Sequence, residues 1–506
     1  MQGTSSRSAW DFLPFPPPIT GGEPGGMPET GIDVRETHIG AVFLVGDRAY
    51  KLKKPVDLGF VDFTDRATRE RVCHREVELN RRLSPDVYLG VADLHGPDHR
   101  VCEHLVVMRR MPEDRRLSTL VRAGAPLAHT VRVLARTVAR FHAAAERGPR
   151  ISEQGSRAAI RRRWEDSFAQ VRPFHGVALH PETADEIERL TREFLDGRDA
   201  LFERRLGDGR VVDGHGDLLA DDIFCLDDGP RVLDCLEFDD RLRWVDGLDD
   251  VAFLAMDLER LGAAGLARQL LDDYAEFSGD PAPPALRHHY TAYRAFVRVK
   301  VACLRFAQGD DSAAVLARAY AEIALRHLRL GRPRMILVGG LPASGKSTLA
   351  GAVADRLGAT VLRSDRIRKE LAGVTPEDSA AAGYREGLYG PETTKRTYDE
   401  MLHRAGELLA LGESVVLDAS WSEAHHRLAA AKAAERAGSP LTQLRCWAPE
   451  TVTAHRLATR TGSISDATPA ILQHMATDVH PWPEAHTVLT AGTTEDSLAQ
   501  ALAYLA

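Results

Sequence analysis

The chain has 506 residues, of which 44% are hydrophobic and 27% are charged, and its formal net charge is −8. At roughly 150 residues per folding unit, this length predicts about three units. The net negative charge disfavours a nucleic-acid-binding protein that relies on a strongly basic surface. The six cysteines are scattered without a CxxC spacing, which indicates reduced thiols rather than a disulfide framework or a zinc site. No apolar run approaches the roughly 18 residues of a membrane span, and the first residues lack a signal-peptide pattern. We therefore expect a cytoplasmic protein with no membrane partner.

The N-terminal part of the chain predicts a flexible tail followed by a small, sheet-rich lobe. Residues 1–30 are rich in proline and glycine and show neither a strand nor a helix pattern. Residues 31 to about 112 predict strands with one amphipathic helix between them. The expected elements are strands at 41–45 and 49–54 joined by a turn at Gly46 and Asp47, a helix at 66–83, and a strand at 104–111.

Residues from about 113 to 327 predict a larger lobe that is mainly helical. A compact stretch of alternating character interrupts the helices at 211–239. In the predicted helix 292–306, Arg294 and Arg298 share one face. That face can bind an anionic acceptor or another domain, or it can be an ordinary solvated helix face.

Residues 335–506 follow a short basic linker, residues 328–334, and alternate between apolar runs and helical patterns. This alternation predicts a parallel sheet sandwiched by helices, that is, an α/β domain. The expected strands are MILVGG (335–340), ATVLR (359–363), SVVLD (414–418), TQLRCW (442–447) and HTVLT (486–490).

A phosphate-binding loop lies between the first of these strands and the helix that follows it. The segment GLPASGKS matches G-x-x-x-x-G-K-S/T. Two glycines let the backbone curl so that its N–H groups point at phosphate oxygens. Lys346 is placed to reach the β- and γ-phosphates, and the Ser347 hydroxyl to hold Mg²⁺. We therefore expect ATP and Mg²⁺ as cofactors, bound by Gly340, Leu341, Pro342, Ala343, Ser344, Gly345, Lys346, Ser347 and Thr348.

Charged side chains follow the next strands, at the edge where ligands bind in an open α/β sheet. Asp365 can accept the proton of an attacking hydroxyl, and Arg368 can hold an anionic substrate. The alternative is that Asp365 is a helix N-cap beside solvated arginines. Asp418, at the end of a later strand, fits an acidic position that supports Mg²⁺. Arg456 and Arg460 share a helix face and either close over the phosphoryl group or line a solvated surface.

The segments GLPASGKST, RSDRIRKEL, VVLDAS and RLATR together resemble the P-loop kinases. This family includes polynucleotide 5′-hydroxyl kinases, zeta-toxin-like proteins and small-molecule kinases such as gluconate kinases. The resemblance covers about 335–506. It implies that Asp365 acts as base or orients the acceptor, that Arg368 contacts the substrate, and that the acceptor carries a hydroxyl group. With Arg460 as a candidate from its helix face, these are the catalytic residues expected in this domain. The resemblance does not choose the acceptor.

A second group of motifs, HGDLLADDI (215–223) and VLDCLEF (232–238), resembles the catalytic and metal-binding loops of aminoglycoside phosphotransferases and their protein-kinase relatives. The resemblance implies that Asp217 is the catalytic aspartate and that Asp234 chelates Mg²⁺. Asp222 stands where asparagine is usual and can still bind the metal. Leu219 replaces a usual histidine and cannot donate a hydrogen bond.

The same resemblance extends over about 34–325 and implies a protein-kinase-like α+β domain. Lys51 matches the lysine that holds the nucleotide phosphates, and Lys53, on the same strand face, is the alternative. Glu76 matches the helix glutamate that pairs with that lysine.

The whole chain thus resembles a fusion of an aminoglycoside-phosphotransferase-like domain with a P-loop ATP-binding domain. We expect a bifunctional phosphotransferase that moves the γ-phosphoryl group of ATP to a hydroxyl of a small molecule. One alternative is an N-terminal pseudokinase that gates a P-loop ATPase, which Leu219 and Asp222 motivate. The other is a nucleic-acid 5′-hydroxyl kinase, which the net charge and the lack of an aromatic, basic stretch disfavour.

Overall fold

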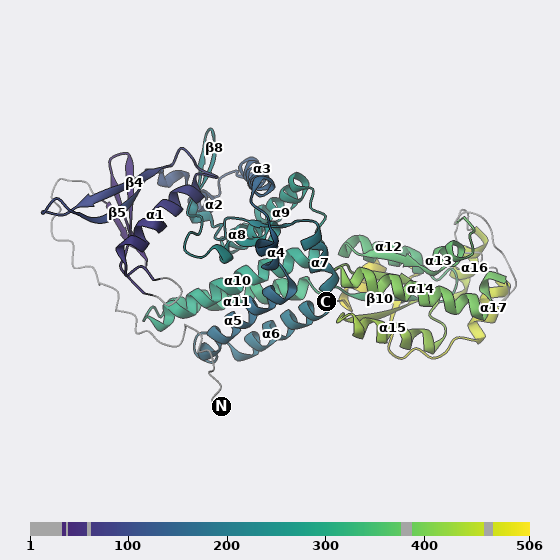
Figure 1. Cartoon of the computed structure of the whole chain (residues 1–506). Coiled ribbons are helices and arrows are strands. Elements are labelled where there is room, and N and C mark those ends of the chain that lie inside the picture. Colours follow the sequence, from purple (N-terminus) through teal and green to yellow (C-terminus); the bar gives the residue numbers. More distant parts are fainter. Residues whose placement is uncertain (1–32, 37–38, 58–61, 376–386, 460–468, 506) are drawn as a thin grey trace, which may run out of the picture. The chain divides into compact units, whose positions relative to one another are not determined.

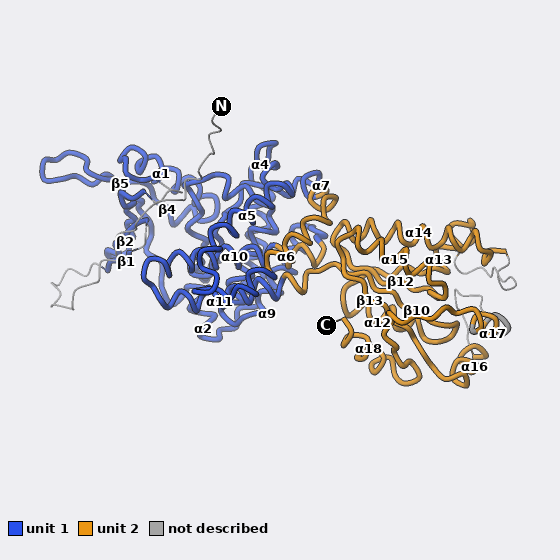
Figure 2. Tube along the Cα trace, turned by 90° about the horizontal axis from the view of Figure 1, so that it is seen from below, with its two compact units in different colours: residues 1–186, 205–282, 290–327 blue, residues 187–204, 283–289, 328–506 orange. Residues whose placement is uncertain are grey.

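The computed structural model describes residues 33–505 except for 37–38, 58–61, 376–386 and 460–468. The chain divides into two compact units, coloured separately in Figure 2. The sequence pattern assigns 187–204 and 283–289 to the first domain, and its domain boundaries stay a prediction. Unit 1 comprises Met1–Glu186, Arg205–Ala282 and Tyr290–His327, and unit 2 comprises Ile187–Arg204, Pro283–His289 and Leu328–Ala506.

Unit 1 contains a five-stranded antiparallel sheet in the order β1-β2-β3-β5-β4. Strands β2 and β3 are joined by the expected tight turn, in which Gly46 has a φ of 57°. Helix α1 begins after Asp65, whose carboxylate accepts the Thr68 N–H, and buries Cys73 and Val77 in the core under the sheet. The bounds are β1 Asp33–Glu36, β2 Gly40–Val45, β3 Arg48–Lys53, α1 Arg66–Asn80, β4 Tyr88–His95 and β5 Val101–Arg109.

The rest of unit 1 is mainly helical, as the sequence predicts, and carries two short antiparallel strand pairs. The pairs β6–β9 and β7–β8 bracket the two loops that bear the acidic motifs 215–223 and 232–238. The strands are β6 Val211–Asp213, β7 Ile223–Leu226, β8 Gly229–Val232 and β9 Trp244–Asp246.

The helices between α2 and α11 follow in chain order, and α6, α7, α10 and α11 contribute residues to both units. They are α2 Leu117–Arg122, α3 Ala128–Ala144, α4 Pro149–Glu153, α5 Arg157–Val171, α6 Pro181–Asp196, α7 Asp199–Gly207, α8 Gly247–Arg260, α9 Ala264–Ser278, α10 Pro284–Ala307 and α11 Ala313–Leu330.

Unit 2 is built on a parallel five-stranded sheet in the order β11-β12-β10-β13-β14. All five apolar runs that the sequence singled out form its strands, so the expected α/β fold is confirmed. Because side chains alternate between the faces of a strand, Met335 and Leu337 pack with α13, α14 and α15, whereas Ile336 and Val338 pack with α12 and α18. The strands are β10 Met335–Gly339, β11 Thr360–Arg363, β12 Val415–Asp418, β13 Leu441–Trp447 and β14 His486–Leu489.

The helices of unit 2 cover both faces of this sheet (Figure 1). None of the described helices of the chain is both long enough and apolar enough to cross a membrane. The helices are α12 Lys346–Leu357, α13 Ser364–Leu371, α14 Pro391–Ala410, α15 Ala424–Arg436, α16 Glu450–Thr459, α17 Pro469–Thr477 and α18 Thr494–Ala503.

The register of the parallel strands brings their carboxyl ends to one edge of the sheet. Arg363 of β11 pairs with Asp418 of β12, which pairs in turn with Val338 of β10. The loop that begins at Gly340 therefore leaves the sheet beside both charged residues.

Candidate functional site

The phosphate-loop segment of unit 2 has a backbone that only glycine tolerates at two positions. Gly340 has a φ of 135°, and a Cβ there would lie 2.6 Å from the Cys446 carbonyl oxygen. Gly345 has a φ of 89° and is followed directly by helix α12. Inside the loop, the Ser344 hydroxyl is buried and has no hydrogen-bond partner in the described part of the chain. A tight loop that opens onto a helix N-terminus fits a phosphate group.

Residues from the neighbouring strand and helix hold this loop in shape. The Thr490 hydroxyl donates to the Ser344 carbonyl oxygen at 2.5 Å. Arg456 donates to the Thr490 carbonyl oxygen at 2.6 Å and lies 3.5 Å from the Ala343 carbonyl oxygen. Arg456 thus supports the loop from behind, and the alternative of a purely solvated arginine is wrong for this residue. Sequence analysis missed Thr490, although its position just after β14 places it at the ligand edge of the sheet.

Lys346, Ser347 and Asp418 meet at the mouth of the loop. The Lys346 ammonium donates to the Leu341 carbonyl oxygen at 2.9 Å, within the loop itself. The Ser347 hydroxyl donates to Asp418, which is 5% exposed. Burial raises the pKa of Asp418, although Lys346 and Ser347 act to lower it. A carboxylate and a hydroxyl side by side are oxygen ligands suited to Mg²⁺.

Asp365 lies at the same edge, in the first turn of α13. Its charge is close enough to raise the pKa of Asp418 and of Tyr398. The N-cap of α13 is Arg363, and no side chain forms a capping hydrogen bond there. The alternative in which Asp365 is the helix cap is therefore wrong. Arg363 was not singled out from the sequence, yet its Nε lies 3.8 Å from an oxygen of Asp418.

The two remaining arginines expected at this site behave differently from each other. Arg368 is buried and donates to the Leu388 carbonyl oxygen at 2.9 Å and to the Thr394 hydroxyl at 3.0 Å. Its guanidinium also lies over the Tyr389 ring, 4.8 Å from the centroid. Arg368 therefore packs against residues 388–394 and is not a solvated arginine. Arg460 lies outside the described residues.

In unit 1 the structure brings together the lysine and the two acids expected at a nucleotide site. The Lys51 ammonium lies 2.9 Å from Glu76 on α1 and also pairs with Asp234. Lys53 lies 2.5 Å from the other oxygen of Glu76 and pairs with Glu237. Since only Lys51 contacts Asp234, Lys51 is the better placed of the two lysines for a metal-bound phosphate.

Three carboxylates, those of Asp217, Asp222 and Asp234, lie close enough to influence one another. Burial raises the pKa of Asp217 to about 6, with Asp234 adding to the rise and Arg298 opposing it. Burial also raises the pKa of Asp222 well above its ordinary value, and Asp234 and Asp217 add to the effect. Burial opposes ionisation of Asp234 too, but Lys51 lowers its pKa. A half-buried set of acidic oxygens that repel one another fits a divalent cation.

The backbone of both loops is held in an uncommon shape. Asp234 has a φ of 64°, a left-handed conformation that is rare for residues other than glycine, and its N–H donates to the Tyr88 hydroxyl at 3.0 Å. Gly216, next to Asp217, has a φ of 85°. Such conformations persist where the surroundings fix them, and they concentrate at functional sites.

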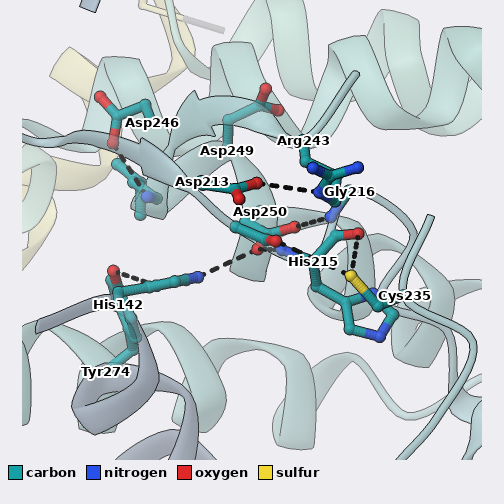
Figure 3. Close-up of polar contacts among 12 residues, drawn as sticks. His142, Asp213, His215, Gly216, Cys235, Arg243, Asp246, Asp249, Asp250 and Tyr274 are labelled. Atoms are coloured by element: carbon teal, nitrogen blue, oxygen red, sulfur yellow. Dashed lines mark hydrogen bonds and ion pairs between the residues drawn. The ribbon is translucent and has the colours of Figure 1, made fainter. Parts of the chain in front are cut away.

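Asp250 on α8 fixes the loop that carries Asp217, as Figure 3 shows. Its carboxylate accepts the N–H groups of His215 at 2.7 Å and Gly216 at 2.9 Å. It also bonds to Nε2 of His142 at 3.0 Å. Sequence analysis missed this residue, which stands directly before the apolar run VAFLAM (251–256) and carries no local signal that its carboxylate is buried.

Arg294 also supports this loop and does not face solvent. It donates to the Asp249 carboxylate at 2.7 Å and to the Gly216 carbonyl oxygen at 3.2 Å. The alternative of a solvated face is therefore wrong for Arg294, whereas a role in acceptor binding stays a prediction. Arg298 remains near Asp217, whose pKa it acts to lower.

Comparisons with known proteins show what this chain is similar to. A family model described as an AAA domain matches residues 335–481. The uncharacterized protein Rv2004c of Mycobacterium tuberculosis H37Rv is 44% identical over 473 residues, which is 94% of this chain and 95% of the relative. The uncharacterized protein Mb2027c of Mycobacterium bovis matches to the same extent. This chain belongs to the family of these mycobacterial proteins.

Solved structures show further likenesses for each part of the chain. A choline/ethanolamine kinase family protein from Mesorhizobium loti covers 60% of this chain and 93% of its own, with 14% identity and a TM-score of 0.37. A gluconokinase from Sinorhizobium meliloti 1021 covers 34% of this chain and 91% of its own, with 24% identity and a TM-score of 0.25.

Proposed function

We propose that this protein is an ATP- and Mg²⁺-dependent phosphotransferase whose unit 2 transfers the γ-phosphoryl group to a hydroxyl of a small molecule. The observation that carries the proposal is the meeting of Ser347, Asp418 and Asp365 at the mouth of the phosphate loop. Catalysis of phosphoryl transfer consists mostly of positioning the reactants and stabilising charge. The phosphate loop, the cation ligands and the candidate base are the parts that it needs.

Each of these residues has a task in the proposed reaction. The N–H groups of the loop hold the phosphates, and Lys346 exchanges its bond to the Leu341 carbonyl for the β- and γ-phosphate oxygens. Ser347 and Asp418 hold Mg²⁺, which supplies charge neutralisation at the phosphate oxygens. Asp365 accepts the proton of the acceptor hydroxyl and orients it.

Unit 1 provides a second phosphotransfer site in this proposal, which makes the protein bifunctional. Lys51, which pairs with Glu76, binds the nucleotide phosphates, and Asp222 and Asp234 would hold the cation. Asp217 acts on the acceptor hydroxyl. A pKa of about 6 leaves its carboxylate ionised at neutral pH and near the optimum for a general base.

The first test is the substitution Asp365→Asn in the full-length chain carrying Lys51→Met, which inactivates the proposed site of unit 1. Transfer of radioactive phosphate from [γ-³²P]ATP is measured against a panel of sugars, polyols, amino alcohols, nucleosides and a 5′-hydroxyl oligonucleotide. With an acceptor found, the variant keeps its ATP affinity and loses about 10²–10⁴-fold in rate, the usual contribution of a general base. Asp355→Asn, at an exposed position on α12, is the matched control and keeps the full rate.

Two results would count against this assignment. Turnover of Asp365→Asn within about threefold of the parent chain is too small for a general base and removes Asp365 from the chemistry. Labelling of the oligonucleotide alone would replace the small-molecule acceptor by a nucleic-acid end.

A further inference from the structure

Five charged side chains of alternating sign form an open row of four ion pairs in unit 1. In order they are Asp234, Lys51, Glu76, Lys53 and Glu237. Lys51 and Lys53 are two residues apart on β3 and share one face of the strand. Asp234 and Glu237, the two ends of the row, are three residues apart on one loop, so the row joins β3, α1 and this loop.

The two ends of this row of ion pairs differ in their exposure. On the outer side, the side chains of Lys51 and Asp234 are 14% and 46% exposed. On the inner side, those of Lys53, Glu76 and Glu237 are at most 5% exposed. The outer pair can therefore reach a ligand, whereas the inner three are shielded from solvent.

Glu76 stands at the junction of the two sides, with one oxygen on each lysine. Its carboxylate is buried, which opposes ionisation, but Lys51 and Lys53 lower its pKa. Lys53 is likewise held in its charged form by Glu237 and Glu76, against the effect of burial. A buried charge that loses a partner is strongly destabilised, so Glu76 needs a second cation whenever Lys51 turns toward a ligand.

Nucleotide binding would turn Lys51 toward a ligand in this way, and Glu76 would then need Lys53 as its second cation. In the proposed site, Lys51 moves its ammonium to phosphate oxygens and Asp234 moves to the cation, which breaks the Lys51–Asp234 pair. The Lys53 contacts to Glu76 and Glu237 do not involve the ligand and stay intact.

We propose that Lys53, anchored by Glu237, is a positioning residue that keeps Glu76 in place so that Lys51 stays aimed at the nucleotide phosphates. This inference rests on the proposed nucleotide site of unit 1. A merely structural Lys53 would instead join β3 to the loop, and any well-packed pair of side chains could replace it.

The test distinguishes a positioning role of Lys53 from a merely structural one by removing both members of the Lys53–Glu237 ion pair. All variants are made in the full-length chain carrying Lys346→Ala, which silences the phosphate loop of unit 2. Mg²⁺-dependent binding of a fluorescent ATP analogue and the melting temperature are measured on the same samples. The variants are Lys53→Met, the double variant Lys53→Met/Glu237→Met, Lys51→Met, and the control Lys54→Met, whose ammonium pairs with Glu36 at 3.1 Å.

Lys53→Met lowers both the melting temperature and the nucleotide affinity, the latter by about 10–100-fold, as for other residues that orient a ligand-holding group. The double variant regains stability, because an apolar pair can replace a buried ion pair, but it does not regain affinity. Lys54→Met changes neither quantity.

Recovery of nucleotide affinity in the double variant would overturn the proposal, because Lys53 would then only join β3 to the loop that carries Glu237. Failure of Lys53→Met alone to fold leaves the double variant as the deciding sample. An unchanged affinity in Lys51→Met would show instead that the proposed nucleotide site of unit 1 is wrong.

Discussion

Replacing Asp250 by asparagine tests whether one buried carboxylate sets the shape of the loop that carries Asp217. Asp250 is 0% exposed and accepts two backbone N–H groups, those of His215 and Gly216. Because an ionised carboxylate only accepts, His142 donates from Nε2, and its Nδ1, 2.9 Å from the Tyr274 hydroxyl, accepts from it. In the variant, an amide NH₂ faces at least one of these three donors.

The expected cost follows from this geometry. Loss of one partner from a buried, charged hydrogen-bond network costs about 3–5 kcal/mol, compared with about 1 kcal/mol for an ordinary hydrogen bond. We expect Asp250→Asn to lower the free energy of unfolding of unit 1 by about this amount, measured by urea denaturation followed by tryptophan fluorescence. Glu78→Gln, at an exposed position on α1 where Glu78 pairs with Arg75, is the control and changes stability by about 0.5 kcal/mol or less.

The pH dependence gives the same residue a second signature. Burial opposes ionisation, but the hydrogen bond from His142 holds the pKa of Asp250 well below its ordinary value. A lowered carboxylate pKa adds stability that is fully present above the unfolded value of about 3.9 and is lost as the pH falls toward the folded value. The difference between parent and variant therefore shrinks below about pH 4. A loss of less than about 1 kcal/mol at pH 7, the size of a single ordinary hydrogen bond, would refute this account of the loop.

Three further predictions concern the phosphate loop, the acid of unit 1 and the thiols. Gly340→Ala abolishes nucleotide binding in unit 2, measured by calorimetry, because the added Cβ would lie 2.6 Å from a backbone oxygen. The control Gly351→Ala on α12 leaves binding intact, because its added Cβ meets no atom within 4 Å. In a chain whose phosphate loop is inactivated by Lys346→Ala, the phosphotransfer rate of unit 1 falls about tenfold per pH unit below about pH 6, since protonated Asp217 cannot accept a proton. A rate that stays constant from pH 7 to pH 5 would exclude Asp217 as the base. One thiol per chain, that of Cys102, reacts quickly with a disulfide reagent, and the five buried cysteines react only after unfolding; more than one fast thiol in the folded chain would contradict the burial.

The fold of unit 2 could be predicted from the sequence because its signals are local. Each strand is a short apolar run, and the phosphate motif fixes the edge at which Asp365 and Asp418 must lie. In unit 1, the strand β4 was not predicted. Its sequence YLGVADLH contains a glycine and has register shifts against β5, so strict alternation is lost.

The supporting residues could not be predicted because their partners are distant in sequence. Asp250 contacts a loop 35 residues earlier along the chain, and Arg294 contacts Gly216, 78 residues away. Both read as surface charges on helices unless the packing is known. Arg368 is similar: its position near Asp365 suggested a substrate contact, whereas its hydrogen bonds go to residues of the segment 388–394.

The number of nucleotides bound per chain tests the central claim most directly. We would titrate the full-length protein with a non-hydrolysable ATP analogue and Mg²⁺ in a calorimeter, and repeat the titration with Lys346→Ala, with Lys51→Met and with both substitutions together. The account predicts two nucleotides per parent chain, one for each single variant and none for the double variant. A double variant that still binds one or two nucleotides would contradict the placement of the sites at these two lysines.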